Sequence, residues 1–373
     1  MLNDEQRRPS KAPIHAVVFG LVTALAPGCA SIKPLAPGEA LSAAQRRDAI
    51  RRAVVWMPTD VSAVDFRKGP DGHDGFDPNQ WVECDYAEKD MSGASPKFTC
   101  VIPPDRTIKV KYGATNPEVF GEVLASRLLW GLGFPADMMF PVRVRCRGCS
   151  ADPQHDPGKK EAETHEFDPA AIEIKLPGRA METFTDSGWD WKELDDIGPD
   201  APKDARIHRD ALKLLAAIIQ HGDSRPANQR LLCPADRLDG RLGCEAPLMM
   251  IHDVGLTFGK ATRLHKSASA VNFEKWESVP VWRDKGKCVA ALKNSFFGRF
   301  HNPTISEGGR GFLAGLLNQL SDAQLRDLFE TARVPKRRSK DGDGAQSASA
   351  DIDEWVRVFK EKRAEISEAR CPR

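Results

Sequence analysis

The stretch "IIQHGDSRPANQRLL" (residues 218–232) decides how the fold of this sequence is interpreted. An apolar run ends at Ile219, a polar loop with Asp223 and Asn228 follows, and a second apolar run begins at Leu231. One interpretation is a polar turn, because Asp and Asn side chains hydrogen-bond their own backbone in turns. The other is a metal–nucleotide site, because side-chain oxygens of this kind bind Mg²⁺. Features elsewhere in the chain have to distinguish the two.

Length and charge limit the size of the core and the classes of partner to be expected. The chain has 373 residues, of which 41% are hydrophobic and 29% charged, and its formal net charge is +1. This length suffices to bury a substantial core in one large domain or two lobes. A net charge near zero creates no overall field that favours nucleic acid, so we expect no nucleic-acid partner.

The N-terminus has the pattern of a targeting segment. Basic residues at 7–11 precede an apolar stretch at 16–26, which is too short to span a membrane and fits the apolar part of a signal peptide. The following "APGCA" resembles a bacterial lipoprotein signal, with residues 1–28 removed and Cys29 lipidated. We therefore expect an exported chain, in the periplasm or at the cell surface, anchored to the membrane through this lipid. A plain cleaved signal peptide with an incidental Cys29 is the alternative.

Eight further cysteines suggest disulfide bonds, because an even number is typical of exported proteins. Local spacing suggests two pairs across hairpins and one within a tight loop, and the last pair follows by elimination, although sequence alone does not settle the pairing. The "CRGC" motif can instead be half a zinc site or a redox pair, but no second such motif completes it. The suggested pairs are Cys84–Cys100, Cys233–Cys244, Cys146–Cys149 and Cys288–Cys371.

The order of elements predicts an α+β chain with two lobes. Short β-branched and aromatic runs such as "KFTCVI" and "TIKVKYG" predict an antiparallel sheet, interrupted by one helix at 116–134. Later apolar runs at helical spacing predict a mainly helical second half. We expect a helical tether at 29–58, an N-lobe at 59–176, a C-lobe at 177–336, a low-complexity linker at 337–350 and a final helix within 351–373.

Phosphoryl transfer from ATP requires a Lys on a strand, a Glu on a helix, an Asp and an Asn on one loop, and a second Asp before a glycine. Lys111, Glu122, Asp223, Asn228 and Asp253 occur in that order, each on the expected type of element. Any one of them is explained as a turn residue or a solvated charge. The ordered set favours the metal–nucleotide interpretation.

These segments resemble parts of known kinases. "GEVLASRLLWGLGF" (121–134), "AIIQHGDSRPANQRLL" (217–232) and "PLMMIHDVG" (247–255) are similar to the helix, catalytic loop and metal-binding loop of HipA-type and phosphatidylinositol kinases. "AIEIKL" (171–176) resembles the strand that enters their adenine-binding hinge. The similarity spans 105–260 with gaps. It implies a bilobal protein-kinase-like fold, with an antiparallel sheet and one helix in the N-lobe and a mainly helical C-lobe.

The resemblance also implies roles. Asp223 is expected to be the catalytic Asp, with Asn228 and Asp253 as Mg²⁺ ligands and Lys111 as the phosphate-binding Lys paired with Glu122. The expected cofactors are Mg²⁺ and ATP, and the acceptor is an unknown protein or small molecule. Lys109, which alternation places on the same strand face as Lys111, is expected to contact the nucleotide, and so are Glu173 and Lys175.

Two departures keep other functions open. Arg225 stands where those kinases often carry a His, and no clear glycine-rich phosphate loop is present. A non-catalytic pseudokinase-like binding module is therefore one alternative, and a nucleotidyl transferase on the same fold is another. The histidines near the site, His208, His221 and His252, lack metal-ligand spacing, and we expect no ligand role for them.

Overall fold

The computed structural model describes residues 40–372 except 71–74, 92, 94, 186, 199–200, 241, 260–270, 293–299 and 337–349. The predicted signal peptide, Cys29 and nearly all of the predicted linker lie outside the described residues. Helix α1 (Ala43–Arg51) lies within the segment predicted as a tether, and Ser42 and Gln45 begin it with a capping box. No helix in the described part of the chain is long and apolar enough to cross a membrane.

The strands of the first half of the chain form a closed barrel. The strands run in the order β1-β2-β3-β5-β4, and β1 pairs with β4 in parallel whereas the other pairs are antiparallel. The expectation of a wholly antiparallel sheet is therefore wrong for the β1–β4 pair. These two strands are far apart in the sequence, so local patterns do not indicate the direction in which they pair. The strands are β1 (Trp81–Ala87), β2 (Lys97–Ile102), β3 (Arg106–Tyr112), β4 (Met138–Arg147) and β5 (Thr164–Ile174).

Strand β3 shows why the barrel has two chemical faces. Side chains alternate along a strand, so Ile108 and Val110 enter the barrel's own core. Lys109 and Lys111 point to the opposite face. That outer face meets helix α2 (Glu118–Gly131), of which nearly every residue is buried. Burial on all sides is expected of a helix enclosed between two packed units.

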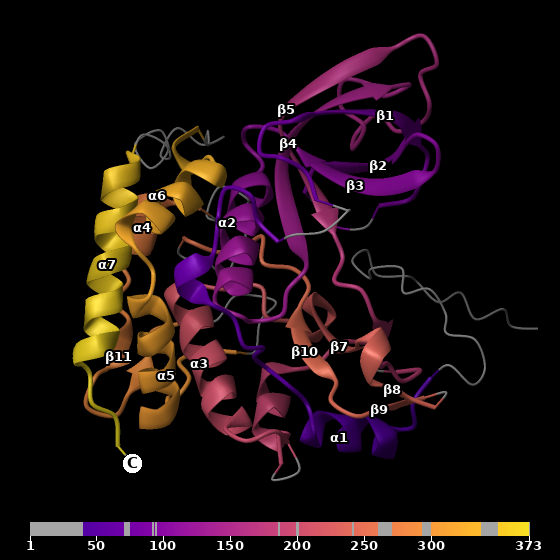
Figure 1. Cartoon of the computed structure of the whole chain (residues 1–373). Helices are drawn as coiled ribbons and strands as arrows, with labels where there is room; N and C mark the ends of the chain where they lie inside the picture. The colour runs from indigo at the N-terminus through magenta and orange to yellow at the C-terminus, as the bar shows by residue number, and fades with distance from the viewer. Residues whose placement is uncertain are drawn as a thin grey trace, which may run out of the picture.

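The other side of α2 belongs to a mainly helical core, and the whole chain is a mixed α+β structure (Figure 1). In this core α3 packs on α5, α7 packs on α5 and α6, and α6 contacts α2. The helices are α3 (Ala205–Ile218), α4 (Phe273–Glu277), α5 (Glu307–Asn318), α6 (Asp322–Thr331) and α7 (Ile352–Glu368).

Short strands position the two polar loops. A three-stranded sheet has the order β10-β7-β6, and β7 (Gln229–Cys233) pairs antiparallel with β10 (Leu248–Ile251). Asn228 therefore comes directly before one strand, and Asp253 lies two residues after the other. The remaining short elements are β6 (Arg179–Ala180), β8 (Leu238–Asp239), β9 (Gly243–Cys244), β11 (Trp282–Asp284) and β12 (Val289–Ala290), with 3₁₀ turns at Val61–Ala63, Trp191–Asp196, Pro226–Asn228, Ala235–Arg237 and Val334–Lys336.

Eight cysteines are placed as four disulfide pairs, and these are the pairs that the spacing suggested. The bridges are Cys84–Cys100, Cys146–Cys149, Cys233–Cys244 and Cys288–Cys371, with Cα–Cα distances of 5.8, 5.6, 5.9 and 5.4 Å. These separations lie in the usual range for disulfides.

Candidate functional site

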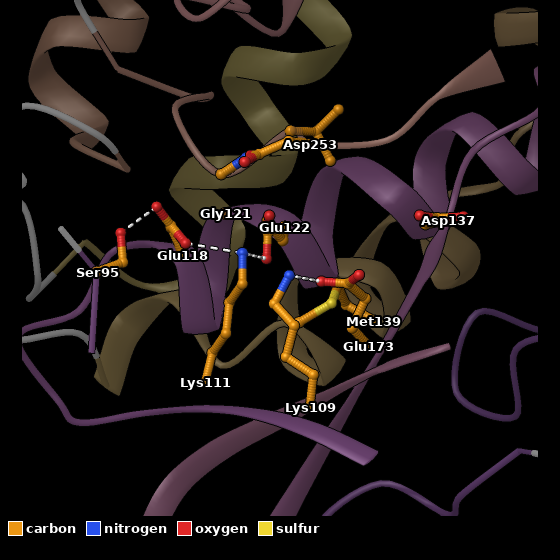
Figure 2. A network of polar contacts seen from close by, with 12 residues as sticks. Ser95, Lys109, Lys111, Glu118, Gly121, Glu122, Asp137, Met139, Glu173 and Asp253 are labelled. Carbon is orange, nitrogen blue, oxygen red and sulfur yellow. Dashed lines mark hydrogen bonds and ion pairs between the residues drawn. The ribbon is translucent and has the colours of Figure 1, made fainter. Parts of the chain in front are cut away.

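The centre of the site is Lys111, a buried ammonium held by two carboxylates of α2. Its Nζ lies 2.7 Å from Glu118 Oε2 and 2.5 Å from Glu122 Oε2, and only 2% of the side chain is exposed (Figure 2). Burial alone would lower the pKa of Lys111, but the charges of Glu118, Glu122 and Asp253 outweigh it and raise that pKa well above its usual value. Lys111 is therefore charged at neutral pH.

Glycines let α2 approach the loop that carries Asp253. A Cβ on Gly121 would lie 2.7 Å from Val271 Cγ2 and 3.0 Å from the carbonyl oxygen of Gly255. A Cβ on Gly255 would lie 2.5 Å from Glu118 Cγ. The Thr257 hydroxyl lies 2.9 Å from the carbonyl oxygen of Val254 and 3.3 Å from that of Gly121, so its donated hydrogen bond is shared between the loop and the helix. The helix bearing both carboxylates is thus packed directly on this loop.

Asp253 is partly exposed and remains ionised. Its Oδ1 accepts a hydrogen bond from the backbone N–H of Gly255 at 3.0 Å. Burial raises the pKa of Asp253, but Lys111, this N–H and His252 together lower it far below its ordinary value. In Figure 2 Asp253 is drawn above the Lys111–Glu122 pair, and the charges of Asp253 and Lys111 act on each other's pKa.

Asp223 and Asn228 belong to one hydrogen-bonded loop. The Asn228 side-chain N–H donates to the backbone carbonyl of Asp223 at 2.8 Å. The backbone carbonyl of Asn228 accepts from the N–H groups of His252 at 2.8 Å and Asp253 at 3.1 Å. These hydrogen bonds therefore join two loops that lie some thirty residues apart in the sequence.

The Asp223 carboxyl is buried and only half satisfied. Its Oδ2 lies 3.1 Å from Arg225, whereas its Oδ1 has no hydrogen-bond partner. Burial raises the pKa of Asp223, Arg225 lowers it, Asp253 raises it further, and the net shift is upward. Because Asp253 affects this pKa, the two carboxyls act on each other across the site.

Lys109, Glu173 and Lys175 were also predicted to contact the nucleotide, and the structure gives each of them different neighbours. Lys109 forms an ion pair with Glu173, its cross-strand neighbour on β5. Burial raises the pKa of Glu173, but Lys109, Lys111 and His252 lower it to about 2. Lys175 lies one residue beyond β5 with an exposed side chain, and burial of its ammonium and the charge of Arg230 lower its pKa, whereas the charges of Glu173 and Asp137 raise it.

Two residues that contact or face Lys111 were not predicted. Glu118 is the second carboxylate on Lys111, and its position one turn before Glu122 on the same helix face was a usable signal. Lys97 lies directly opposite Lys111 on β2, and burial lowers its pKa. Nothing local in the sequence indicated Lys97, because its role depends on the register between two strands.

The donor set suits a cation bound to a polyphosphate. Asp253 supplies an ionised carboxylate and Asn228 an amide oxygen, the ligand types that Mg²⁺ prefers. Lys111 supplies fixed positive charge for phosphate oxygens, and the unpartnered Oδ1 of Asp223 can accept a hydrogen bond from an incoming hydroxyl. These residues fit a Mg²⁺–nucleotide complex.

Comparisons with known proteins add little to this geometry. No family model matches the sequence, and no curated protein matches it. Among solved structures, a Helicobacter pylori proinflammatory kinase, CtkA, matches with 11% identity and a TM-score of 0.43, covering 78% of this chain and 96% of that one. Because the TM-score is below 0.5, we base no conclusion on this similarity.

Proposed function

We propose that this chain is an exported, lipid-anchored phosphotransferase with a bilobal protein-kinase-like fold, which uses Mg²⁺ and ATP on a protein or small-molecule acceptor. The observation that carries the proposal is the buried Lys111, clamped by two helix carboxylates beside an ionised Asp253. Burying an ion pair is costly unless its geometry is good and further hydrogen bonds satisfy the charged groups. A fixed cation facing a metal-binding carboxylate is the arrangement that phosphoryl transfer requires.

Each residue then has a defined task. Lys111 binds phosphate oxygens, and Glu118 and Glu122 fix the position of its ammonium. Asn228 and Asp253 would hold Mg²⁺, which offsets charge on the transferring group when it is bound. Asp223 orients the acceptor hydroxyl through its free Oδ1 and accepts the proton, a task that its raised pKa favours.

The first test is nucleotide binding. We expect Mg²⁺·ATP at about a hundred times Kd to stabilise the oxidised protein by roughly 2.7 kcal/mol, measured by thermal or urea unfolding. Asp253→Asn should lose this effect. Asp239→Asn is the matched control, because Asp239 is an exposed carboxylate in β8. Equal stabilisation of all three proteins would refute the assignment of Asp253.

The second test separates reactions. ATP labelled at the γ-phosphate should transfer label to the acceptor if the chain is a kinase, whereas transfer from the α-phosphate would identify a nucleotidyl transferase. Asp223→Ala should abolish either transfer but keep Mg²⁺·ATP binding. Unchanged turnover in this variant would contradict the role of Asp223.

A non-catalytic binding module is the second candidate. The observation that favours it is the contact of Arg225 with Asp223 Oδ2, which occupies one oxygen of the proposed catalytic carboxyl. Mg²⁺-dependent stabilisation without label transfer, in wild type and in Arg225→His alike, would support this candidate over the kinase.

A further inference from the structure

A second group of polar side chains lies beside the proposed nucleotide site. Asp137, Glu173 and His252 each offer one ligand atom, and these atoms lie within 4.8 Å of one another. His252 Nδ1 is 2.5 Å from Asp137 Oδ2, and Asp137 Oδ1 accepts the backbone N–H of Leu176 at 2.8 Å. Asp137 directly precedes β4, Glu173 lies in β5, and His252 directly follows β10.

Glu173 provides an independent reason to place a ligand here. Its side chain is more than nine-tenths buried, yet its Oε1 has no hydrogen-bond partner. Its Oε2 pairs with Lys109, and Figure 2 shows the other oxygen pointing away from Lys109, to the side on which Asp137 lies. An unpaired buried carboxylate oxygen is costly, and a bound cation removes that cost.

The chemistry of these ligands selects the class of ion. Two carboxylates and one imidazole form a set that suits zinc and similar transition metals, whereas Mg²⁺ prefers oxygen ligands only. Cations surround these two carboxylates, because the charges of Lys109 and Lys111 act on Glu173, and Lys175 interacts with both Glu173 and Asp137.

We propose that Asp137, Glu173 and His252 bind one divalent transition-metal ion of the zinc class, separate from the Mg²⁺ of the nucleotide site. Zinc–ligand bonds of about 2.0–2.2 Å place tetrahedral ligand atoms about 3.4 Å apart, so the 2.5 Å contact between His252 Nδ1 and Asp137 Oδ2 would lengthen when the ion binds between them. The Leu176 N–H is not a metal ligand, but its hydrogen bond to Asp137 Oδ1 orients the Asp137 carboxylate. His252 is 16% exposed, which gives the ion a route from solvent.

The ion would tie the barrel to the loop of Asp253. Asp137 directly precedes barrel strand β4 and Glu173 lies in barrel strand β5, whereas His252 follows β10 and directly precedes Asp253. Backbone contacts already join these segments, since the Asp137 N–H donates to the Ile251 carbonyl at 3.1 Å. A metal at this junction would hold the two parts together and restrain the position of Asp253.

The test uses the oxidised full chain, treated with a chelator and titrated with Co²⁺ and then Zn²⁺. We expect one ion per chain, a Co²⁺ absorption band that Zn²⁺ removes, and a higher thermal midpoint. His252→Gln and Asp137→Asn should each weaken binding about tenfold or more. Asn keeps an oxygen for the Leu176 N–H, so the Asp137→Asn variant should still fold, and its metal-free midpoint is measured beside that of the wild type.

Two controls isolate the site. His155→Gln removes a histidine from an exposed His–Asp pair with Nδ1 2.8 Å from Asp152, and it should bind the metal like wild type. Asp253→Asn should lose Mg²⁺·ATP but keep Zn²⁺, so the two proposals fail independently. Absence of binding in the wild type, undiminished binding in His252→Gln, or loss of Zn²⁺ in Asp253→Asn would each overturn the proposal.

Discussion

Substituting Gly121 by Ala tests the contact on which the site geometry depends. In open space a Gly→Ala change inside a helix stabilises a protein by roughly 0.8–1 kcal/mol. At Gly121 the new Cβ would lie 2.7 Å from Val271 Cγ2 and 3.0 Å from the Gly255 carbonyl oxygen. Overpacking of this kind costs about 1–3 kcal/mol, so we expect a net loss of up to about 2 kcal/mol.

Gly315 supplies the matched control, because it lies in α5, is exposed, and a Cβ added there would have nothing within 4 Å. Gly315→Ala should raise the free energy of unfolding by up to about 1 kcal/mol. The difference between the two variants in urea unfolding therefore measures the steric cost at Gly121 alone, about 1–3 kcal/mol.

The same variant has a functional readout. Displacing α2 from the loop should move Glu118 and Glu122 relative to Asp253, and so weaken stabilisation by Mg²⁺·ATP in Gly121→Ala but not in Gly315→Ala. Equal shifts in unfolding free energy for the two variants would refute the close packing of α2 on the Asp253 loop.

Three further outcomes are expected. Lys111→Met should cost about 3–5 kcal/mol in urea unfolding, because it leaves two carboxylates of α2 without their buried partner; a cost below about 1 kcal/mol would contradict this pairing. His221 is buried with both ring nitrogens unpartnered, and burial lowers its pKa to about 4. Its contribution to stability is therefore full above about pH 6.5 and falls by about 3 kcal/mol as pH drops through 4, and a His221→Leu variant should lack this part of the acid profile. The Cys288–Cys371 disulfide closes a loop of 83 residues, and the Cys233–Cys244 disulfide closes a loop of 11. Replacing both cysteines of the first bridge by Ser should lower the free energy of unfolding by about 1–2 kcal/mol more than the same double substitution in the second, measured by denaturant unfolding.

Local patterns in the sequence were enough to locate most elements of the site. Alternation along β3 placed Lys109 and Lys111 on one face, and apolar spacing located α2 with Glu122 on it. The polar loop after an apolar helix located Asp223 and Asn228, and the turn after a strand located Asp253. These features are short-range, because helix and strand periods and turn chemistry act over a few neighbouring residues.

Other features depend on segments that meet only in the folded chain. Closure of the barrel by the parallel β1–β4 pair, and the register that sets Lys97 opposite Lys111, follow from pairing between distant strands. No local pattern indicated a ligand role for His252, since its carboxylate neighbours lie far away along the chain.

The sequence therefore determined the types and order of the chemical groups, because residue identity and local periodicity are written in it directly. Tertiary packing decided which groups are buried, which oxygen of Asp223 and of Glu173 lacks a partner, and which charges shift the pKa values of others. Those properties arise from desolvation and from distances between remote segments, and neither exists until the chain has folded.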